Sequence, residues 1–307
     1  MRVFITGGSG MLGRNIVREF EKNEFEICAP NRNELDLLNS LDVKKFIADF
    51  KPDLVVHCAG LVGAISENIK HPYEFCFTNL QIGLNVVHAA FSANVSSLIN
   101  ISSANIYPDD NSGSCMNETQ ILCGLLNKDT EGYGLAKACV TKLVEYLSAQ
   151  YSLNYRTLIP CNLYGEWDSF DMNKAHMIPA IIRRLHEAKL NNQKSVEIWG
   201  DGSARREFLF AADLAKYIVS VSDNVKSLPQ NMNVGVSEDF SVLQYNKLIA
   251  AVTGYNGEFH FNENKPVGSK LKRLDLGFAG RMKWSAPTSI ENGIKKTYNF
   301  FLENEGK

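Results

Sequence analysis

A short apolar stretch at the start of the chain leads directly into a glycine-rich loop and then into a helical pattern. Arg2 to Thr6 read RVFIT, and the loop from Gly7 to Gly13 reads GGSGMLG. In this order of elements Gly7 permits a tight turn, Gly10 lets the backbone approach a pyrophosphate and Gly13 allows close helix packing. The unpaired N–H groups at the start of the helix favour an anion. The stretch therefore predicts an α/β fold, a Rossmann doubly wound parallel sheet that binds a dinucleotide; an ordinary glycine-rich loop is the alternative.

The charge balance and the cysteines limit the expected partners and compartment. Lysine and arginine number 32 against 34 aspartates and glutamates, for a net charge of −2, so nothing electrostatic points to a nucleic acid or a membrane. No window approaches the run of about 18 apolar residues that a membrane span needs, and Met1 leads into the first strand without a signal peptide. The seven cysteines show no CxxC or metal-ligand spacing. We expect a cytoplasmic protein with reduced thiols and no metal.

The second expected strand, Phe25 to Ala29, ends at an arginine where an NAD site usually has an acid. PNRN follows at residues 30–33, without a carboxylate for the ribose 2′-hydroxyl. The guanidinium of Arg32 suits a 2′-phosphate, because that contact is charge-assisted. The sequence therefore favours NADP(H), with Arg32 as a simple loop cation as the alternative. Asp36 and Leu37 are placed to meet the adenine edge.

Two further strand ends bring small and polar residues to the same edge of the sheet. Leu54 to Cys58 reads as a buried strand that runs into Ala59-Gly60-Leu61, small residues that let a cofactor lie against the backbone. Ser97 to Ile101 is the next strand, and it places Ser103 at its carboxyl end. The following loop, Asp109 to Glu131, is long and irregular, which is typical of loops that serve a site.

Tyr133 and Lys137 are four residues apart near the start of an expected long helix, so both side chains lie on one helical face. At that spacing the ammonium can lower the pKa of the phenol, and the pair can exchange a proton near neutral pH. If the Ser103 hydroxyl binds a substrate carbonyl oxygen, the tyrosine can protonate that oxygen, as carbonyl reduction requires. For an isolated pair, a surface Tyr and Lys is the alternative.

Periodicity and propensity predict the remaining elements. We expect residues 1–160 to form the NADP-binding domain, to which later segments return, and residues 161–307 to form mainly a smaller α/β substrate lobe.

His57, in the expected strand Leu54 to Cys58, is expected to be a core histidine. The expected helices are Asn15–Glu24, Ser40–Phe50, Gly83–Ala93, Tyr133–Gln150, Pro179–Leu190, Leu214–Asp223, Val242–Thr253 and Ile290–Leu302, with a helix-and-loop stretch at Asn68–Asn79 and strands at Ser195–Trp199, Gln230–Val236 and Phe259–Phe261.

Several motifs together resemble the extended short-chain dehydrogenase/reductases. They are TGGSGMLG at residues 6–13, ISSANIYP at 101–108 and YGLAK at 133–137. Further stretches are similar to the GDP-L-fucose synthase branch, which epimerises GDP-4-keto-6-deoxymannose at C3 and C5 and then reduces C4 with NADPH. The resemblance covers nearly the whole chain. These stretches are NIKHP at 68–72 with Phe75 and Asn79, RTLIPCNLYG at 156–165, HMIPAIIRR at 176–184, WGDG at 199–202 and RREF at 205–208.

The resemblance implies roles for individual residues. Ser103 would polarise the ketone, Tyr133 would protonate its oxygen, and Lys137 would hold the nicotinamide ribose and tune the tyrosine. A homodimer through the helices at 83–93 and 133–150 is the family expectation. The implied cofactor contacts are Gly7, Gly10, Met11, Leu12, Gly13, Arg32, Asp36, Leu37, Ala59, Gly60, Leu61, Tyr133, Lys137 and Leu163. The implied substrate contacts are Ser103, Asn105, Asn162, His176, Arg184, Trp199, Arg206 and Lys272.

Asn105 departs from the family pattern. It stands where the family has the cysteine that acts as base in epimerisation, while His176 occupies the position of its histidine partner. An amide has no accessible basic form, so it cannot take a proton from a carbon next to a ketone. We therefore expect NADPH-dependent C4 reduction of a GDP-4-keto-6-deoxy sugar, hexose or heptose, without epimerisation, in nucleotide-sugar synthesis for surface glycans such as capsule or lipopolysaccharide. A bifunctional GDP-L-fucose synthase, a UDP- or dTDP-sugar enzyme and a non-catalytic nucleotide-binding scaffold are the alternatives.

Overall fold

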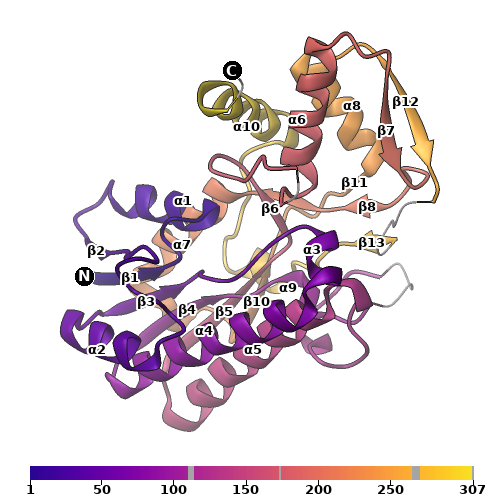
Figure 1. Cartoon of the computed structure of the whole chain (residues 1–307). Coiled ribbons are helices and arrows are strands. Elements are labelled where there is room, and N and C mark those ends of the chain that lie inside the picture. Colours follow the sequence, from indigo (N-terminus) through magenta and orange to yellow (C-terminus); the bar gives the residue numbers. More distant parts are fainter. Residues whose placement is uncertain (110–113, 173, 265–269, 306–307) are drawn as a thin grey trace.

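A six-stranded parallel sheet forms the centre of the computed structural model, which describes residues 1–109, 114–172, 174–264 and 270–305 (Figure 1). The strand order is β10-β5-β4-β3-β1-β2, so the direction of winding reverses between β1 and β3. Open α/β sheets bind ligands at the carboxyl ends of the strands beside such a switch point. The predicted doubly wound parallel sheet is confirmed. Its strands are β1 (Arg2–Thr6), β2 (Glu26–Cys28), β3 (Leu54–His57), β4 (Ser97–Ile101), β5 (Asn154–Pro160) and β10 (Asn231–Val234).

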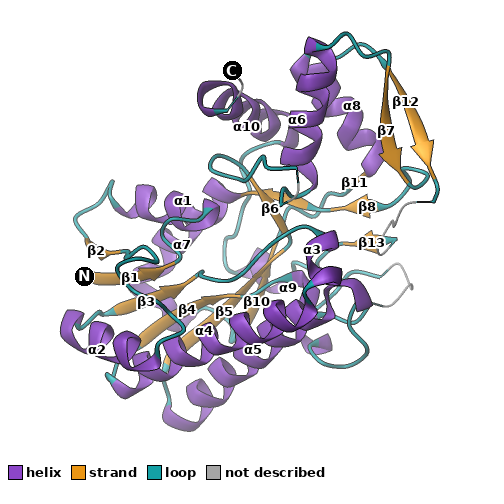
Figure 2. Ribbon diagram, in the orientation of Figure 1, coloured by secondary structure: helices purple, strands orange, loops and turns teal. Residues whose placement is uncertain are grey.

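Helices cover both faces of this sheet (Figure 2). Successive residues of a strand point to opposite faces, and Val3 and Ile5 of β1 accordingly pack in the core with α1 (Met11–Phe20) and α7 (Ala211–Val221). Phe4 packs in the core on the other face. Because both faces are buried, strands such as β3 read as continuous apolar runs. The helices of the second face are α2 (Ser40–Phe50), α4 (Pro72–Ser92) and α5 (Glu131–Tyr151).

A second lobe, at the top of Figure 1, has an apolar core of its own. Buried aromatic side chains such as Tyr164, Phe170, Tyr245 and Phe301 fill it. The short strand β8 lies between β11 and β13, and β7 pairs with β12. The elements of this lobe are β6 (Asn162–Tyr164), α6 (Met177–Leu190), β7 (Ser195–Trp199), β8 (Arg205–Arg206), β9 (Phe208–Phe210), β11 (Phe240–Ser241), α8 (Val242–Thr253), β12 (Glu258–Asn262), β13 (Leu271–Lys272) and α10 (Ile290–Asn304).

Some segments from the second half of the chain lie in the large domain. α7 packs against α1, β10 adds the edge strand next to β5, and the short helix α9 (Gly277–Arg281) packs against β10. The chain therefore crosses between the two lobes more than once. Among the described residues, the structure has no helix with the length and apolarity needed to span a membrane.

Two helices begin earlier than their periodicity predicts. α1 begins at Met11 instead of Asn15, because Gly10 is its N-cap and the end of the glycine loop forms the first turn. α4 begins at Pro72 instead of Gly83, since proline is well tolerated in a first helical turn. The short helix α3 (Ile65–Lys70) precedes it. The other predicted helices and strands begin within a few residues of the predicted positions, whereas the sequence analysis gives no prediction for β5, β6, β8, β9, β11, β13 or α9.

Candidate active site

The loop after β1 is packed too closely for a side chain at Gly7, Gly8 and Gly13. Gly7 has a φ of 72°, in the left-handed region, and a Cβ there would lie 2.8 Å from the Ala59 backbone. A Cβ at Gly13 would lie 1.9 Å from the carbonyl oxygen of Gly7. At Gly10 the nearest atom would be 3.4 Å away, an ordinary contact, so the protein leaves space over this residue. The loop fits a pyrophosphate that meets the backbone at Gly10 and the first N–H groups of α1.

An asparagine of α4 fixes the segment after β3. Asn79 is buried; its Oδ1 accepts the N–H of Leu61 at 2.9 Å, and its Nδ2 donates to the Leu61 carbonyl at 3.0 Å. A Cβ at Gly60 would lie 2.7 Å from Asn79 Oδ1, so this segment also requires a glycine. The contact between Gly7 and Ala59 joins the two loops at the switch point. The predicted cofactor residues in these two loops are Gly7, Gly10, Met11, Leu12, Gly13, Ala59, Gly60 and Leu61.

The predicted adenosine residues follow β2. Arg32 and Asp36 are exposed, whereas Leu37 is partly buried against the core. Asp36 Oδ1 accepts the N–H of Leu38 at 3.0 Å, and Glu34, an acid in the same turn, accepts the N–H of Asn31 at 2.8 Å. An accessible guanidinium in a turn whose acids bind backbone groups suits a 2′-phosphate.

Ser103 and Tyr133 meet at the carboxyl end of β4. Ser103 is the N-cap of a 3-10 turn over Ala104–Ile106, and its hydroxyl accepts the N–H of Asn105 at 3.2 Å. Burial raises the pKa of Tyr133 to about 12, although the neighbouring Ser103 side chain lowers that pKa in part. At neutral pH the phenol therefore carries its proton.

Lys137 lies on the same face of α5 and is buried. Its Nζ donates to the carbonyl oxygen of Ile101 at 3.0 Å, and a Cβ at Gly60 would lie 3.6 Å from this nitrogen. Burial lowers the pKa of Lys137 to about 8, and the nearby Cys58 thiol raises it in part. The net shift of the Tyr133 pKa is upward, against the expectation of a lowered value, because burial outweighs the other influences on the phenol.

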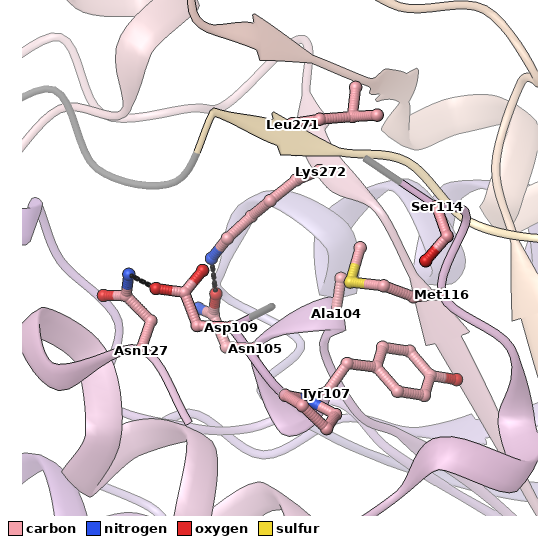
Figure 3. A pocket seen from close by; sticks show the side chains of 10 residues that line it. Ala104, Asn105, Tyr107, Asp109, Ser114, Met116, Asn127, Leu271 and Lys272 are labelled. Atoms are coloured by element: carbon pink, nitrogen blue, oxygen red, sulfur yellow. Dashed lines mark hydrogen bonds between the residues drawn. The ribbon is translucent and has the colours of Figure 1, made fainter. Parts of the chain in front are cut away.

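A small polar pocket lies beside Asn105 (Figure 3). Lys272 Nζ donates to Asn105 Oδ1 at 2.7 Å, and Asn127 Nδ2 donates to Asp109 Oδ2 at 2.6 Å. Burial lowers the pKa of Lys272 to about 8; Arg206 lowers it further and Asp109 opposes the change. The cavity measures about 10 Å³, close to the smallest volume that holds one water molecule. It accommodates one small polar group.

Four predicted substrate or cofactor residues come from short strands of the second lobe. Arg206 of β8 is the direct parallel partner of Lys272 in β13, so their two cations lie side by side. Asn162 of β6 donates from Nδ2 to the carbonyl oxygen of Glu207 at 2.9 Å, and Leu163 follows it in the same strand. Two adjacent cations next to the site suit a diphosphate.

His176, Arg184 and Trp199 belong to α6 and β7. His176 is the N-cap of α6, and burial lowers its pKa. Arg184 donates to Asn246 Oδ1 at 3.1 Å, and Trp199 is half exposed at the end of β7. In the described part of the chain, hydrogen bonds join Asn105 to Ser103 and to Lys272, but they do not extend to His176.

The comparison with known proteins agrees with this geometry. Residues 3–235 match the NAD dependent epimerase/dehydratase family. The chain belongs to this family. It is 41% identical to GDP-L-colitose synthase of Yersinia pseudotuberculosis, with 99% of both chains covered. It is 43% identical to GDP-L-fucose synthase of Azorhizobium caulinodans, with 98% of this chain and 96% of the relative covered. The resemblance stated from the motifs is confirmed.

Two solved structures of Campylobacter jejuni proteins are similar over nearly their full length. One is a GDP-6-OMe-4-keto-L-xylo-heptose reductase, with a TM-score of 0.91, 29% identity and coverage of 99% of this chain and 98% of the other. The second is a GDP-mannoheptose C4 reductase with NADP bound, with a TM-score of 0.88, 29% identity and 98% of each chain covered. The large sheet and the second lobe of this chain are therefore arranged as in these two reductases.

Glu207 is an organising residue that the sequence reasoning missed. Its carboxylate is fully buried; Oε1 accepts the N–H groups of Val236 and Ser237 at 2.6 and 3.0 Å, and Oε2 accepts that of Leu274 at 2.9 Å. One side chain thus ties the segment that carries Arg206 to two distant loops. Asp109 and Asn127 were missed as well, since only the length of the loop between them pointed to a site.

Proposed function

We propose that this chain reduces the C4 ketone of a GDP-linked 4-keto-6-deoxy sugar with NADPH and does not epimerise the sugar. The observation that carries the proposal is the gathering of Ser103, Tyr133 and Lys137 at the carboxyl edge of a sheet with a dinucleotide loop, where Ser103 influences the pKa of the phenol and Lys137 binds the Ile101 carbonyl. The relatives named above supply the GDP-sugar class. Arg32 and the NADP in one similar structure support NADP(H) as cofactor.

The site residues can perform a carbonyl reduction. NADPH, when bound, supplies a hydride to the ketone carbon. The Ser103 hydroxyl donates to the ketone oxygen, and Tyr133 gives that oxygen its phenolic proton as negative charge develops. Lys137, with a pKa of about 8, is mostly protonated at pH 7 and stabilises the phenolate that remains. Arg206 and Lys272 bind the diphosphate side of the substrate, and the exposed indole of Trp199 offers a flat surface for the base or the sugar.

The absence of epimerisation follows from Asn105. Its amide cannot remove the proton at C3 or C5, and its Oδ1 already accepts the Lys272 ammonium. The test incubates the protein, NADPH and GDP-4-keto-6-deoxymannose in D2O and analyses the product by NMR. We expect NADPH oxidation with protium retained at C3 and C5. Solvent deuterium at either carbon would contradict a reductase without epimerase activity.

Reduction with epimerisation is the second candidate, and Lys272 is the observation in its favour. With a pKa of about 8 and a place next to Asn105, this lysine has a neutral fraction near pH 8 that could act as the base. The D2O experiment separates the two functions, and a Lys272→Met variant shows whether any exchange depends on this amine. Competition of GDP, UDP and dTDP for binding tests the nucleotide, with GDP expected to bind most tightly.

The protein's assembly and compartment are further parts of the proposal. We place homodimerisation on the outer faces of α4 and α5, where Tyr73, Phe77 and Tyr146 are exposed. All seven cysteines are unpaired thiols, which supports action in the reducing cytoplasm. The product would be a GDP-deoxy sugar for a surface glycan.

A further inference from the structure

An arginine in the last turn of α1 contacts a loop of the second lobe. Arg18 donates from Nη1 to Glu166 Oε2 at 2.7 Å and from Nη2 to Asn15 Oδ1 at 2.8 Å. Its Cζ lies 4.6 Å from a ring centroid of Trp167, so the guanidinium is placed over the indole. Asn15 belongs to α1 itself, whereas Glu166 and Trp167 follow β6. One guanidinium thus joins the large domain to the second lobe.

Both ends of this connection lead to predicted site residues. On the α1 side, Asn15 is buried, and its Nδ2 donates to the carbonyl oxygen of Met11 at 2.9 Å. Met11 is the first residue of the helix whose N–H groups would meet the pyrophosphate. On the other side, Trp167 follows the strand that contains Asn162 and Leu163. The arginine therefore connects the cofactor helix to a strand with one predicted substrate residue and one predicted cofactor residue.

The loop that contains Trp167 is anchored in the second lobe. The indole meets the ring of Phe300 edge to face, with 5.9 Å between the ring centroids. Phe300 lies on α10 and packs against the apolar core of this lobe. Trp167 has a φ of 64°, in the left-handed region, which is uncommon for a bulky residue and persists where the surrounding contacts fix it. The contacts thus run from α10 through Trp167 to α1, two helices of different lobes (Figure 1).

We propose that Arg18, Glu166 and Trp167 form an interlobe clamp that sets the distance between the bound cofactor and the ketone. The dinucleotide loop is in the large domain, whereas Arg206 and Lys272, on the diphosphate side of the substrate, are in the second lobe. The distance between the hydride and the ketone carbon therefore depends on how the two lobes are fixed to each other. A misplacement of about 1 Å can cost about 100-fold in rate.

The three members of the interlobe clamp are positioning residues, because they act through the arrangement of the lobes. The inference goes beyond the chemistry of the proposed function but rests on it, since the reaction that the clamp assists is the same ketone reduction. Loss of the clamp should slow hydride transfer. Binding of each nucleotide should change little, because the predicted contacts of GDP lie in the second lobe and the dinucleotide loop lies in the large domain.

Arg2 offers a matched control within the large domain. It donates to the two carboxylate oxygens of Glu26 at 3.0 and 2.9 Å, and its Cζ lies 4.5 Å from the ring centroid of Phe50. The side chains of Arg2 and Arg18 are exposed to nearly the same extent, 37% and 36%. Arg2, Glu26 and Phe50 belong to β1, β2 and α2. Arg2→Met therefore removes an ion pair and a cation–π contact of the same kind without changing a contact between the lobes.

The experiment compares Arg18→Met with Arg2→Met. It measures kcat for NADPH oxidation at saturating GDP-4-keto-6-deoxymannose, and the Kd values of NADPH and of GDP by titration. In Arg18→Met we expect kcat to fall by at least about 10-fold while both nucleotides bind nearly as in the wild type. Arg2→Met should keep the wild-type kcat. An equal kcat in the two arginine variants would overturn the clamp.

Variants of Trp167 test whether the residues act as one unit. Trp167→Phe keeps an aromatic ring next to Arg18 and should retain most of the wild-type kcat, whereas Trp167→Leu should lose about as much as Arg18→Met. The double variant Arg18→Met/Trp167→Leu should lose no more than either single variant, because residues in one interaction are not additive. Losses that multiply in the double variant would overturn the clamp. Glu166→Gln, which removes only the charge of the ion pair, decides the case if Arg18→Met fails to bind NADPH; it should lower kcat and keep both affinities.

Hydrogen exchange provides a measurement that does not depend on activity. The amides of residues 165–168 should exchange faster in Arg18→Met than in the wild type, and Arg2→Met should leave them unchanged. Unchanged exchange in Arg18→Met would contradict the clamp. If the wild type binds NADPH and GDP but reduces no GDP-4-keto sugar, the proposed function fails, and the role in hydride transfer fails with it. Active wild type with an unchanged kcat in Arg18→Met overturns the clamp alone.

Discussion

Burial moves the pKa values of Tyr133 and Lys137 in opposite directions, to about 12 and about 8. Both changes favour the neutral form, because a buried charge lacks the solvation of water. For the phenol this means that the proton stays in place until the ketone oxygen gains negative charge. Such a donor stabilises the transition state of the reduction more than the bound substrate. This difference lowers the activation barrier. The Ser103 hydroxyl marks the place where that oxygen would sit.

Tyr133→Phe removes the proton donor while keeping nearly the same volume. We expect kcat to fall by about 10²- to 10⁴-fold, the usual contribution of a positioned acid, while the variant still binds NADPH. The measurements are NADPH oxidation at saturating sugar and fluorescence titration of the cofactor. Tyr151→Phe, an exposed tyrosine at the end of the same helix, is the control and should keep full activity. A Tyr133→Phe enzyme with wild-type kcat would exclude this residue as the donor and favour a non-catalytic scaffold.

His57 gives the fold an acid sensitivity of its own. It is buried at the end of β3, its Nδ1 lies 2.8 Å from the Thr6 hydroxyl, and burial lowers its pKa to about 3, with Lys137 acting in the same direction. The unfolded chain takes up a proton at this residue near pH 6.5, whereas the folded chain does so only near pH 3. The stability contributed by neutral His57 is thus fully present above pH 6.5 and is lost as the pH falls toward 3.

His57→Asn should make the protein less sensitive to acid. Between pH 6 and 4 we expect the wild-type free energy of unfolding to fall more steeply than that of the variant, by up to about 1.4 kcal/mol per pH unit. Urea unfolding at several pH values measures the two slopes. Asp168, whose pKa burial raises to about 7, has the opposite pH dependence in both proteins and cancels in the difference. Equal slopes would show that His57 does not titrate as described.

At the scale of elements, two glycines in the loop after β1 should have different roles. We expect Gly13 to be needed for packing and Gly10 for cofactor binding. Gly13→Ala should destabilise the protein strongly, because its Cβ would lie 1.9 Å from the Gly7 carbonyl oxygen. Gly10→Ala meets nothing closer than 3.4 Å and Gly10 has a negative φ, so the fold should tolerate it. We expect Gly10→Ala to keep a melting temperature near that of the wild type but to bind NADPH at least about 10-fold more weakly. Wild-type affinity in this variant would show that the cofactor does not approach Gly10.

Local elements could be predicted from the sequence, but the contacts between them could not. The glycine loop, β3 and α8 are encoded by nearby residues, through glycine requirements and apolar periodicity. By contrast, Asn79 meets Leu61 across 18 positions, Glu207 meets Leu274 across 67 and Lys272 meets Asn105 across 167. Such polar pairs follow from how the lobes pack, and no local pattern specifies them. The motif resemblance therefore identified Asn105 and Lys272 as separate site residues, and only the fold shows that a hydrogen bond joins their side chains.

At the scale of the whole molecule, α4 and α5 each expose a row of mainly apolar side chains. The two helices pack side by side, and on each of them exposed residues recur with the spacing of one helical face. On α4 these are Tyr73, Phe77 and Leu84, with the rings of Tyr73 and Phe77 stacked at 5.6 Å. On α5 they are Leu135, Cys139 and Tyr146. A surface of this kind suits the α4–α5 face of a second copy, because helices from two subunits can bury it in a four-helix arrangement.

We expect the wild type to sediment as a dimer, and a charge placed on this surface to separate the subunits. Phe77→Asp and Tyr146→Asp each put a carboxylate where the two copies would meet, and burying an unpaired charge costs several kcal/mol in order of magnitude. Both variants should therefore sediment as monomers at micromolar concentration. Leu41→Asp is the control: Leu41 is 77% exposed on α2, which carries none of the six residues of this surface, and the variant should stay dimeric. A monomeric wild type would contradict the dimer, and a dimer that survives both charges would place the interface elsewhere.

Tyr133 and Lys137 lie on α5, so loss of the dimer should also lower kcat by changing the position of that helix. The decrease should be larger than that in Leu41→Asp.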